Sequence, residues 1–109
     1  MATIEDFENI DIRVGTIVNV KKFPKAKKPA YKLLIDLGEL GTRQSSAQIT
    51  EKYKVDDLIG RQVICVCNLG TRKIADFDSE VLTTGFANKD GHVILAVPDS
   101  EVENGSKLF

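Results

Sequence analysis

Residues 42–69 read TRQSSAQITEKYKVDDLIGRQVICVCNL, and their pattern changes from extended to helical and back. Residues 42–49 predict one strand, and residues 61–69 predict another that is apolar on both faces at its centre. Between them, residues 50–58 predict a short helix that is capped by Thr50. A helix placed between two strands in the middle of the chain is the feature that decides the fold.

Two strands and a short helix are expected before this stretch. Within residues 12–21 the β-branched residues Ile12, Val14, Thr16, Val18 and Val20 alternate with a more mixed set, Arg13, Gly15, Ile17, Asn19 and Lys21. This alternation predicts a long half-buried strand. Residues 31–38 predict a second strand, and the basic loop FPKAKKPA, with its two prolines, separates the two strands. At the start, Thr3 is a candidate N-cap with Asp6 three residues on, which predicts one short helix.

Further strands are expected after this stretch. Residues 79–87 and 92–98 predict strands joined by the turn NKDG, whose glycine fits a positive φ. Three strands, a short helix and then further strands is the order of an oligonucleotide-binding (OB) fold. In that fold a helix after the third strand plugs the bottom of the barrel. The sequence therefore predicts one all-β domain over residues 1–109, a five-stranded OB barrel with a short N-terminal helix and a barrel-plugging helix.

The composition is that of an ordinary globular protein, with 42% hydrophobic and 28% charged residues. No apolar run approaches the roughly 20 residues that a membrane span needs, and the N-terminus does not resemble a secretory signal. Cys65 and Cys67 are expected to be buried thiols in a reducing cytoplasm. The only histidine, His92, is far from them in sequence, so no metal site and no redox chemistry are expected.

Charge is distributed unevenly along the chain, although the net charge is only −1. Six lysines and no acid occur between residues 21 and 32. The overall balance argues against a dedicated nucleic-acid binder, but a local basic surface can still attract a polyanion. No nucleophile, base and orienting group occur together, and no glycine-rich phosphate loop is present. We therefore expect a binding protein with no enzymatic activity and no cofactor.

Residues 68–82, NLGTRKIADFDSEVL, contain the candidate site. Arg72 and Lys73 follow the end of a strand at the rim of the predicted barrel. There an arginine can fork onto a phosphate and a lysine can add a point charge. A second interpretation is a solvated turn in which Asp76 and Asp78 pair with the two cations. The sequence alone leaves both interpretations open.

Side chains elsewhere extend the candidate site. Ser45 and Ser46 on the third strand can supply neutral hydrogen bonds, and OB barrels bind nucleic acids across this strand and the adjoining loops. Aromatic residues are few, and Phe23, Phe77 and Phe86 are the candidates for exposure. Because a platform for base stacking needs several exposed rings, recognition of folded RNA by shape and backbone fits better.

With these residues the chain resembles the tRNA-binding-domain family, the OB modules attached to some methionyl- and phenylalanyl-tRNA synthetases. The resemblance covers nearly the whole chain. Residues 6–38 resemble the family's opening strands, RQSSAQIT its serine-bearing third strand, and residues 68–82 its signature. SSAQIT together with SEVL is similar to the CsaA branch of stand-alone, export-related chaperones, as is the closing segment PDSEVENGSKL.

The resemblance implies an OB-barrel homodimer whose terminal segments wrap against the partner. It also implies binding of tRNA at its corner by shape, and, for the CsaA branch, binding of unfolded or pre-secretory polypeptides. By match to the signature, the RNA-facing set is Asn68, Arg72, Lys73, Ser79 and Glu80, with Ser45 and Ser46 beside them and Lys32 adding longer-range attraction. For polypeptides we expect contact with apolar rim residues, chiefly Phe77 and then Phe23. The alternative is that Phe77 folds inward and caps the barrel.

The signature departs from that of the tRNA binders at three places. Thr71 stands where they usually have proline, Ile74-Ala75-Asp76 replaces a basic residue and glycine, and Val81-Leu82 replaces Gly-Met. These differences favour the CsaA branch. The leading hypothesis is a homodimeric CsaA-like protein that binds tRNA and chaperones polypeptides. The alternatives are a tRNA-binding accessory subunit of an aminoacyl-tRNA synthetase and a purely structural dimerisation module.

Overall fold

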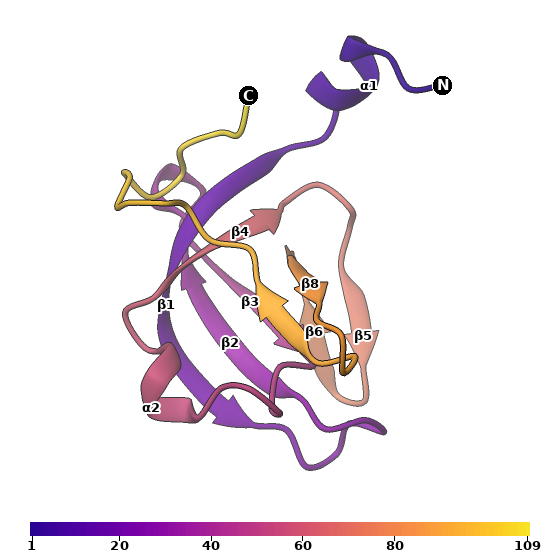
Figure 1. Ribbon diagram of the computed structural model, residues 1–109, viewed down its shortest axis with the longest axis vertical. Helices are drawn as coiled ribbons and strands as arrows, with labels where there is room; N and C mark the ends of the chain where they lie inside the picture. Colours follow the sequence, from indigo (N-terminus) through magenta and orange to yellow (C-terminus); the bar gives the residue numbers. More distant parts are fainter.

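The computed structural model describes residues 1–109, and its centre is a five-stranded antiparallel sheet that curls into a barrel (Figure 1). The strands follow one another across the sheet in the order β3, β2, β1, β4 and β7. Their bounds are Ile12–Lys22 for β1, Tyr31–Asp36 for β2, Thr42–Ala47 for β3, Gln62–Val66 for β4 and Leu82–Thr83 for β7. The predicted OB barrel with short helices is confirmed.

Strand β1 is long enough to serve both halves of the barrel. Its first part pairs with β4 and its second part pairs with β2. The register shifts between Ile17 and Asn19, which marks a bulge where the strand bends. The bulge also changes which side chains face inward, since Ile17 and Val20 are buried whereas Val18 is exposed. The uninterrupted alternation predicted from the sequence is therefore broken at this point.

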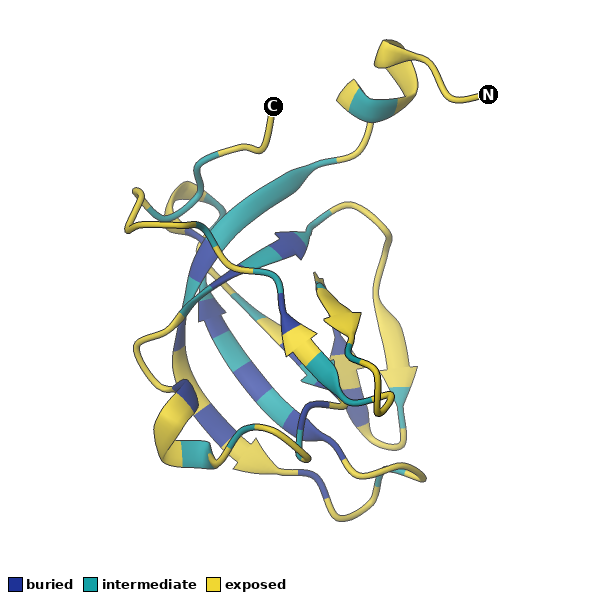
Figure 2. Ribbon diagram, viewed as in Figure 1, coloured by how far each residue is buried: buried dark blue, intermediate teal, exposed yellow.

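Strand β2 supplies much of the core because it alternates strictly. Tyr31, Leu33 and Ile35 are buried, Leu37 continues the same face beyond the strand, and the intervening side chains are half-buried (Figure 2). Each of these large apolar side chains stabilises the fold by roughly 1.5 to 3 kcal/mol on leaving water. A small 3₁₀ helix, η1 (Gly38–Leu40), forms the turn into β3.

Helix α2 (Val55–Leu58) follows β3 and inserts its last residue into the barrel core, where that leucine is fully buried. The helix is shorter than predicted, and Lys54, not Thr50, is its N-cap. The Tyr31 hydroxyl donates a hydrogen bond to the Tyr53 carbonyl at 2.9 Å. This contact between distant segments holds the chain where the sequence pattern predicted the first helical turn.

A hairpin near the C-terminus consists of β8 (Gly85–Ala87) and β9 (Val93–Leu95). The predicted turn joins them, and Gly91 in it has a φ of 82°. The strand expected over residues 79–87 is divided between β7 and β8. β7 pairs with β4 whereas β8 pairs with β9, and Thr84 between them donates to the Ile64 carbonyl of β4 through both its N–H and its hydroxyl.

A second hairpin consists of β5 (Arg72–Ile74) and β6 (Phe77–Ser79). The sequence predicted no strands here. Ala75 in the turn has a φ of 53°, a conformation that residues other than glycine adopt rarely. β6 lies beside β3, and the residues after it bond to β3, so the hairpin covers the outer edge of the five-stranded sheet.

The two termini lie at the same end of the molecule (Figure 1). Helix α1 (Ile4–Glu8) begins at the predicted N-cap, because the Asp6 N–H donates to Thr3 Oγ1 at 3.2 Å and the Thr3 N–H donates to the Asp6 carboxylate at 2.9 Å. It buries none of its residues and stands away from the barrel (Figure 2). The C-terminal segment lies along the first part of β1. None of the helices has the length and apolar character needed to cross a membrane.

Candidate nucleic-acid interface

Two segments that the sequence analysis singled out lie together at the end of the barrel opposite the termini (Figure 1). One is the segment 21–30, made of the last two residues of β1 and the connection to β2, which we call the basic loop because it carries five lysines and no acid. The other is the hairpin β5–β6. They meet through side chains from the tip of the hairpin, so cations that are distant in sequence share one surface.

Ser79 and Glu80 attach the hairpin to β3. The Ser46 N–H donates to Ser79 Oγ at 3.0 Å, and the Gln44 N–H donates to Glu80 Oε1 at 2.9 Å. The Glu80 N–H in turn donates to the Gln44 carbonyl at 2.8 Å. Ser79 is buried. The oxygens of both side chains, which were predicted to face RNA, are thus engaged in holding the hairpin on the sheet.

Phe23 and Phe77 are buried, with only 3% and 9% of their surfaces exposed, so the expectation that they are exposed is wrong. Their rings meet edge to face, with centroids 5.4 Å apart, and with Ala30 they form a small cluster separate from the main core. The inward position of Phe77, considered as the alternative, is the observed one. Phe86 is exposed, as expected.

Lys32 lies over this aromatic pair. Its ammonium nitrogen is 4.7 Å from the Phe23 ring centroid and 5.2 Å from that of Phe77. A cation over two ring faces is attracted by their quadrupoles. The side chain also lines a cleft of about 290 Å³ whose lining residues are Asn19, Lys21, Lys32, Leu33, Leu34, Gln44 and Phe77. Positive charge and amide groups therefore line this cleft on β1–β3.

Arg72 and Lys73 are both exposed on β5. Lys73 Nζ is 3.4 Å from the Asp78 carboxylate, as the solvated-turn interpretation requires. Asp76 does not pair with Arg72, however. It pairs with Lys25 of the basic loop at 2.9 Å, and this hydrogen bond lowers the pKa of the Asp76 carboxyl. Arg72 has no ion pair and no side-chain hydrogen bond, so its guanidinium is free to bind an anion.

Ser45 and Ser46 occupy different environments. Ser45 points into the barrel, is fully buried, and shares a hydrogen bond of 2.8 Å with the Thr83 hydroxyl. Ser46 is half-buried and pairs in register with Lys32 of β2. Of the two serines, only Ser46 lies on the face of the sheet that carries Lys32.

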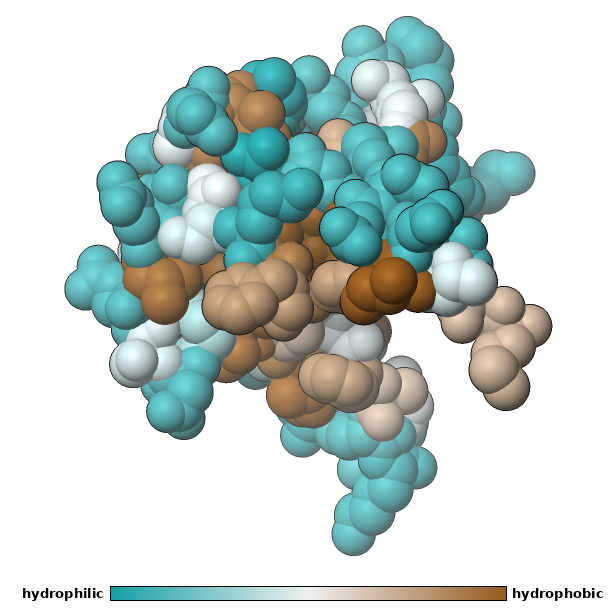
Figure 3. Space-filling view, turned by 90° about the horizontal axis from the view of Figure 1, so that it is seen from above, coloured by the Kyte–Doolittle hydropathy of each residue, from teal (hydrophilic) through white to brown (hydrophobic).

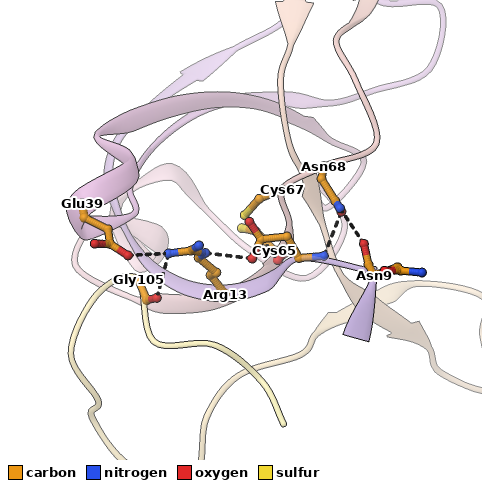
Figure 4. Close-up of polar contacts among 8 residues, drawn as sticks. Asn9, Arg13, Glu39, Cys65, Cys67, Asn68 and Gly105 are labelled. Carbon is orange, nitrogen blue, oxygen red and sulfur yellow. Dashed lines mark hydrogen bonds and ion pairs between the residues drawn. The ribbon is translucent and has the colours of Figure 1, made fainter. Parts of the chain in front are cut away.

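Asn68 ties the start of β1 to the end of β4 (Figure 4). The Asp11 N–H donates to Asn68 Oδ1 at 2.8 Å, and Asn68 Nδ2 donates to the Asn9 carbonyl at 2.8 Å. Both donor and acceptor of the amide are used within the chain. The residue predicted to contact RNA thus orients the segment that leads to α1.

Arg13 is a structural cation that the sequence analysis did not identify. Its guanidinium bonds to Asp11 at 2.8 Å and to Glu39 at 3.0 Å, and its side chain is only 14% exposed (Figure 4). The hydrogen bond that Arg13 donates to Asp11, followed by the one it donates to Glu39, raises the pKa of Arg13. Arg13 faces Cys65 across the β1–β4 pair. A signal existed, since an arginine at an inward position of a strand needs a carboxylate partner.

The two cysteines are free. Cys65 is buried, and burial raises the pKa of its thiol to about 12, while Cys67 is half-buried. The thiol of Cys65 is therefore protonated and poorly nucleophilic in the folded chain. The prediction that Cys65 is a core thiol is confirmed.

Comparison with known proteins connects this fold to a family. The family model described as "Putative tRNA binding domain" matches residues 12–107. The chain belongs to this family. Over its whole length it is similar to two crystal structures, chaperone CsaA from Bacillus anthracis str. Ames (46% identity, TM-score 0.94, 99% of that chain covered) and CsaA chaperone protein from Picrophilus torridus (49%, 0.94, 100%).

Among curated relatives, methionine–tRNA ligase of Methanocaldococcus jannaschii is 38% identical over 105 residues, or 96% of this chain. The chain spans only 16% of the length of that ligase. The resemblance inferred from the signature and the third strand is confirmed. The contribution of single residues to RNA binding stays a prediction.

Proposed function

We propose that the chain binds tRNA through its phosphate backbone, on the surface formed by Arg72, Lys73 and the basic loop. The observation that carries the proposal is the unpaired guanidinium of Arg72, on a hairpin whose tip pairs with the basic loop through Asp76 and Lys25, in a member of the tRNA-binding-domain family. An arginine without a carboxylate partner can engage phosphate without first breaking an ion pair.

Recognition by shape follows from what this surface lacks. Phe23 and Phe77 are buried, so they offer no platform for stacked bases. Arginine and lysine contacts to phosphate carry no base information. Asp76 and Asp78 of the hairpin are already paired with Lys25 and Lys73. This pairing reduces the repulsion between the two acids and phosphate, but it also occupies two cations that could otherwise contact RNA. We expect affinity at the weak, micromolar end, about −8 kcal/mol.

The test is a tRNA-binding titration at several salt concentrations. Arg72→Ala should weaken binding about tenfold and flatten the salt slope by roughly one phosphate contact, to a similar extent for unrelated tRNAs. Lys89→Ala, which removes an exposed cation from the β8–β9 turn, is the matched control and should change little. If Arg72→Ala combined with Lys73→Ala leaves affinity and slope unchanged, the proposed site is wrong.

A second function, binding of unfolded or pre-secretory polypeptides, is favoured by a groove beside the basic loop. Its volume is about 530 Å³, and its lining residues are Lys22, Phe23, Pro24, Ala26, Lys27, Pro29, Ala30, Tyr31 and Thr50. Two similar structures are named as chaperones. Ala26→Glu should reduce suppression of the aggregation of a denatured test protein, whereas Ala87→Glu, at an exposed site elsewhere, should not.

We further propose that the chain acts as a homodimer through the end that carries the termini. Seen from that end, apolar side chains gather in the middle of the face with hydrophilic ones around them (Figure 3). The terminal segments also expose Ile4, Ile10, Leu108 and Phe109. Apolar surface of this kind usually marks an interface. Sedimentation that finds only monomer at micromolar concentration would contradict the dimer.

The alternative role, a tRNA-binding accessory subunit of an aminoacyl-tRNA synthetase, is supported by the similarity to methionine–tRNA ligase. Both roles require binding without catalysis, and the free cysteines fit a reducing cytoplasm. Isolation of the protein from its cells separates the two roles. A synthetase that is recovered with it supports the subunit role, and recovered polypeptide clients support the chaperone role.

A further inference from the structure

We propose that Phe77 and Asp76 are positioning residues for the RNA surface, because they fasten the basic loop to the hairpin that carries Arg72. The inference rests on the proposed tRNA binding. In this arrangement the loop lysines and Arg72 meet the RNA as one prearranged surface. Neither Phe77 nor Asp76 itself needs to touch the RNA.

The fastening consists of an ion pair and an aromatic contact at the tip of the hairpin. Asp76 bonds to Lys25 at 2.9 Å, and the neighbouring Phe77 ring packs edge to face on Phe23. Both rings are buried, although they belong to a cluster outside the main core. The small cluster joins the loop to the hairpin, and Lys32 of β2 lies over its two rings.

Both partners of this contact have a fixed shape of their own. The hairpin is held on β3 through Ser79 and Glu80. The loop is closed by the Phe23 N–H, which donates to the Ala30 carbonyl at 3.2 Å, and by the Ala26 N–H, which donates to the Phe23 carbonyl at 3.2 Å. Contact between two shaped elements fixes the positions of the loop lysines relative to Arg72.

Prearrangement matters because a loose loop must be ordered when RNA binds, which costs conformational entropy for each long side chain that is immobilised. Lys27 and Lys28 are exposed and have no ion pair, so they are free for phosphate. Lys32 contributes to the fastening as well, since its ammonium lies over both rings. The loop lysines should therefore lose part of their contribution to binding when the cluster is weakened.

The decisive variant is Asp76→Asn, for which charge and positioning predict opposite signs. On charge alone, removing an acid beside the site and releasing Lys25 should strengthen tRNA binding and steepen its salt dependence. If Asp76 positions the loop, binding should instead weaken, by about threefold. Asp90→Asn on the β8–β9 turn removes the same charge without touching the loop and is the matched control. It should strengthen binding slightly or leave it unchanged.

A double-mutant cycle tests Phe77. Phe77→Leu keeps an apolar side chain but removes the ring, and the double substitution of Lys27 and Lys28 by Gln removes two loop charges. In the unaltered chain we expect the lysine substitutions to weaken binding about tenfold, and in the Phe77→Leu chain only about threefold. Independent sites would give equal factors in both backgrounds, which would overturn the proposal. Thermal unfolding of each variant, measured in parallel, checks that the chains are folded.

The outcome also separates this inference from the function on which it rests. If Arg72→Ala combined with Lys73→Ala leaves tRNA binding unchanged, the proposed function of this surface fails. If Arg72→Ala weakens binding while Asp76→Asn strengthens it as charge alone predicts, the function stands and the positioning role is overturned. Weaker binding by Asp76→Asn, together with unequal factors in the cycle, supports the positioning role.

Discussion

The two ends of the barrel use charged side chains in different ways. At the end with the termini, Arg13 is 14% exposed and joins Asp11 and Glu39. At the opposite end, Lys25 and Asp76 are 69% and 60% exposed. A half-buried pair cannot lose a partner without leaving a charge unsatisfied, whereas an exposed pair contributes little and exchanges partners easily.

Apolar surface follows the reverse pattern. The terminal end leaves Ile4, Ile10 and Leu108 exposed around its fixed ion pairs. The opposite end buries its aromatic side chains, Phe23 and Phe77, and exposes cations. A charged side chain near a candidate site therefore has to be judged by its burial. These features support the proposed dimer contact at the terminal end and the proposed tRNA contact at the loop end.

The largest expected effect tests how firmly the terminal end is packed. Gly38 has a φ of 65°, and a Cβ there would collide with the Asn104 carbonyl, so Gly38→Ala should lower the free energy of unfolding by about 3 kcal/mol. Gly91 also has a positive φ, of 82°, but a Cβ there would meet no atom within 4 Å. Gly91→Ala should therefore lower the free energy of unfolding by only about 1 kcal/mol. Urea denaturation measures both. Equal losses would mean that the C-terminal segment is not packed on this turn.

A smaller effect distinguishes a residue of the terminal end from a residue of the RNA surface. Asn68→Ala removes two hydrogen bonds that hold Asn9 and Asp11, and should lower the free energy of unfolding by about 1 kcal/mol. It should not change the salt slope of tRNA binding, because the amide faces the chain itself. A loss of tRNA affinity as large as that caused by Arg72→Ala would restore Asn68 to the RNA-facing set.

The smallest effect concerns pH at the loop end. The hydrogen bond from Lys25 lowers the pKa of Asp76 in the folded chain. The pair is therefore present above the ordinary aspartate value of about 3.9, and is lost only as pH falls through the lower folded value. An NMR titration should show Asp76 and the Phe23 and Phe77 ring signals changing together in that acid range. In Asp76→Asn this step should be absent.

Much of the barrel could be predicted because local patterns agreed with the final fold. The alternation of Tyr31, Leu33 and Ile35, the capping box of Thr3 and Asp6, and the glycine turn of the last hairpin all depend on neighbours in sequence. The order of strands and helix then pointed to the OB barrel. Helix α2 was harder, because a hydrogen bond from Tyr31 fixes the chain before it.

The candidate site was predicted less well. The hairpin β5–β6 turns at Ala75 with a positive φ, for which alanine gives no signal. Phe77, which lies between Asp76 and Asp78, was expected to be exposed. The alternation of β6 instead places Asp78 outward and the Phe77 ring inward. The role of Asn68 depends on two backbone groups more than fifty residues away. Arg72 and Lys73 are exposed, as a contact with phosphate requires, but the partners of the cations could be known only from the fold.

The C-terminal segment protects a strand edge. Along the first part of β1 it supplies the neighbour that β2 supplies further on: the Gly105 N–H donates to the Val14 carbonyl and the Leu108 N–H donates to the Ile12 carbonyl. An uncovered strand edge is a template on which foreign chains add themselves. A chain cut before Gly105 should therefore keep most of its core and become prone to aggregate. Residues 105–108 therefore guard the first part of β1 against strand addition.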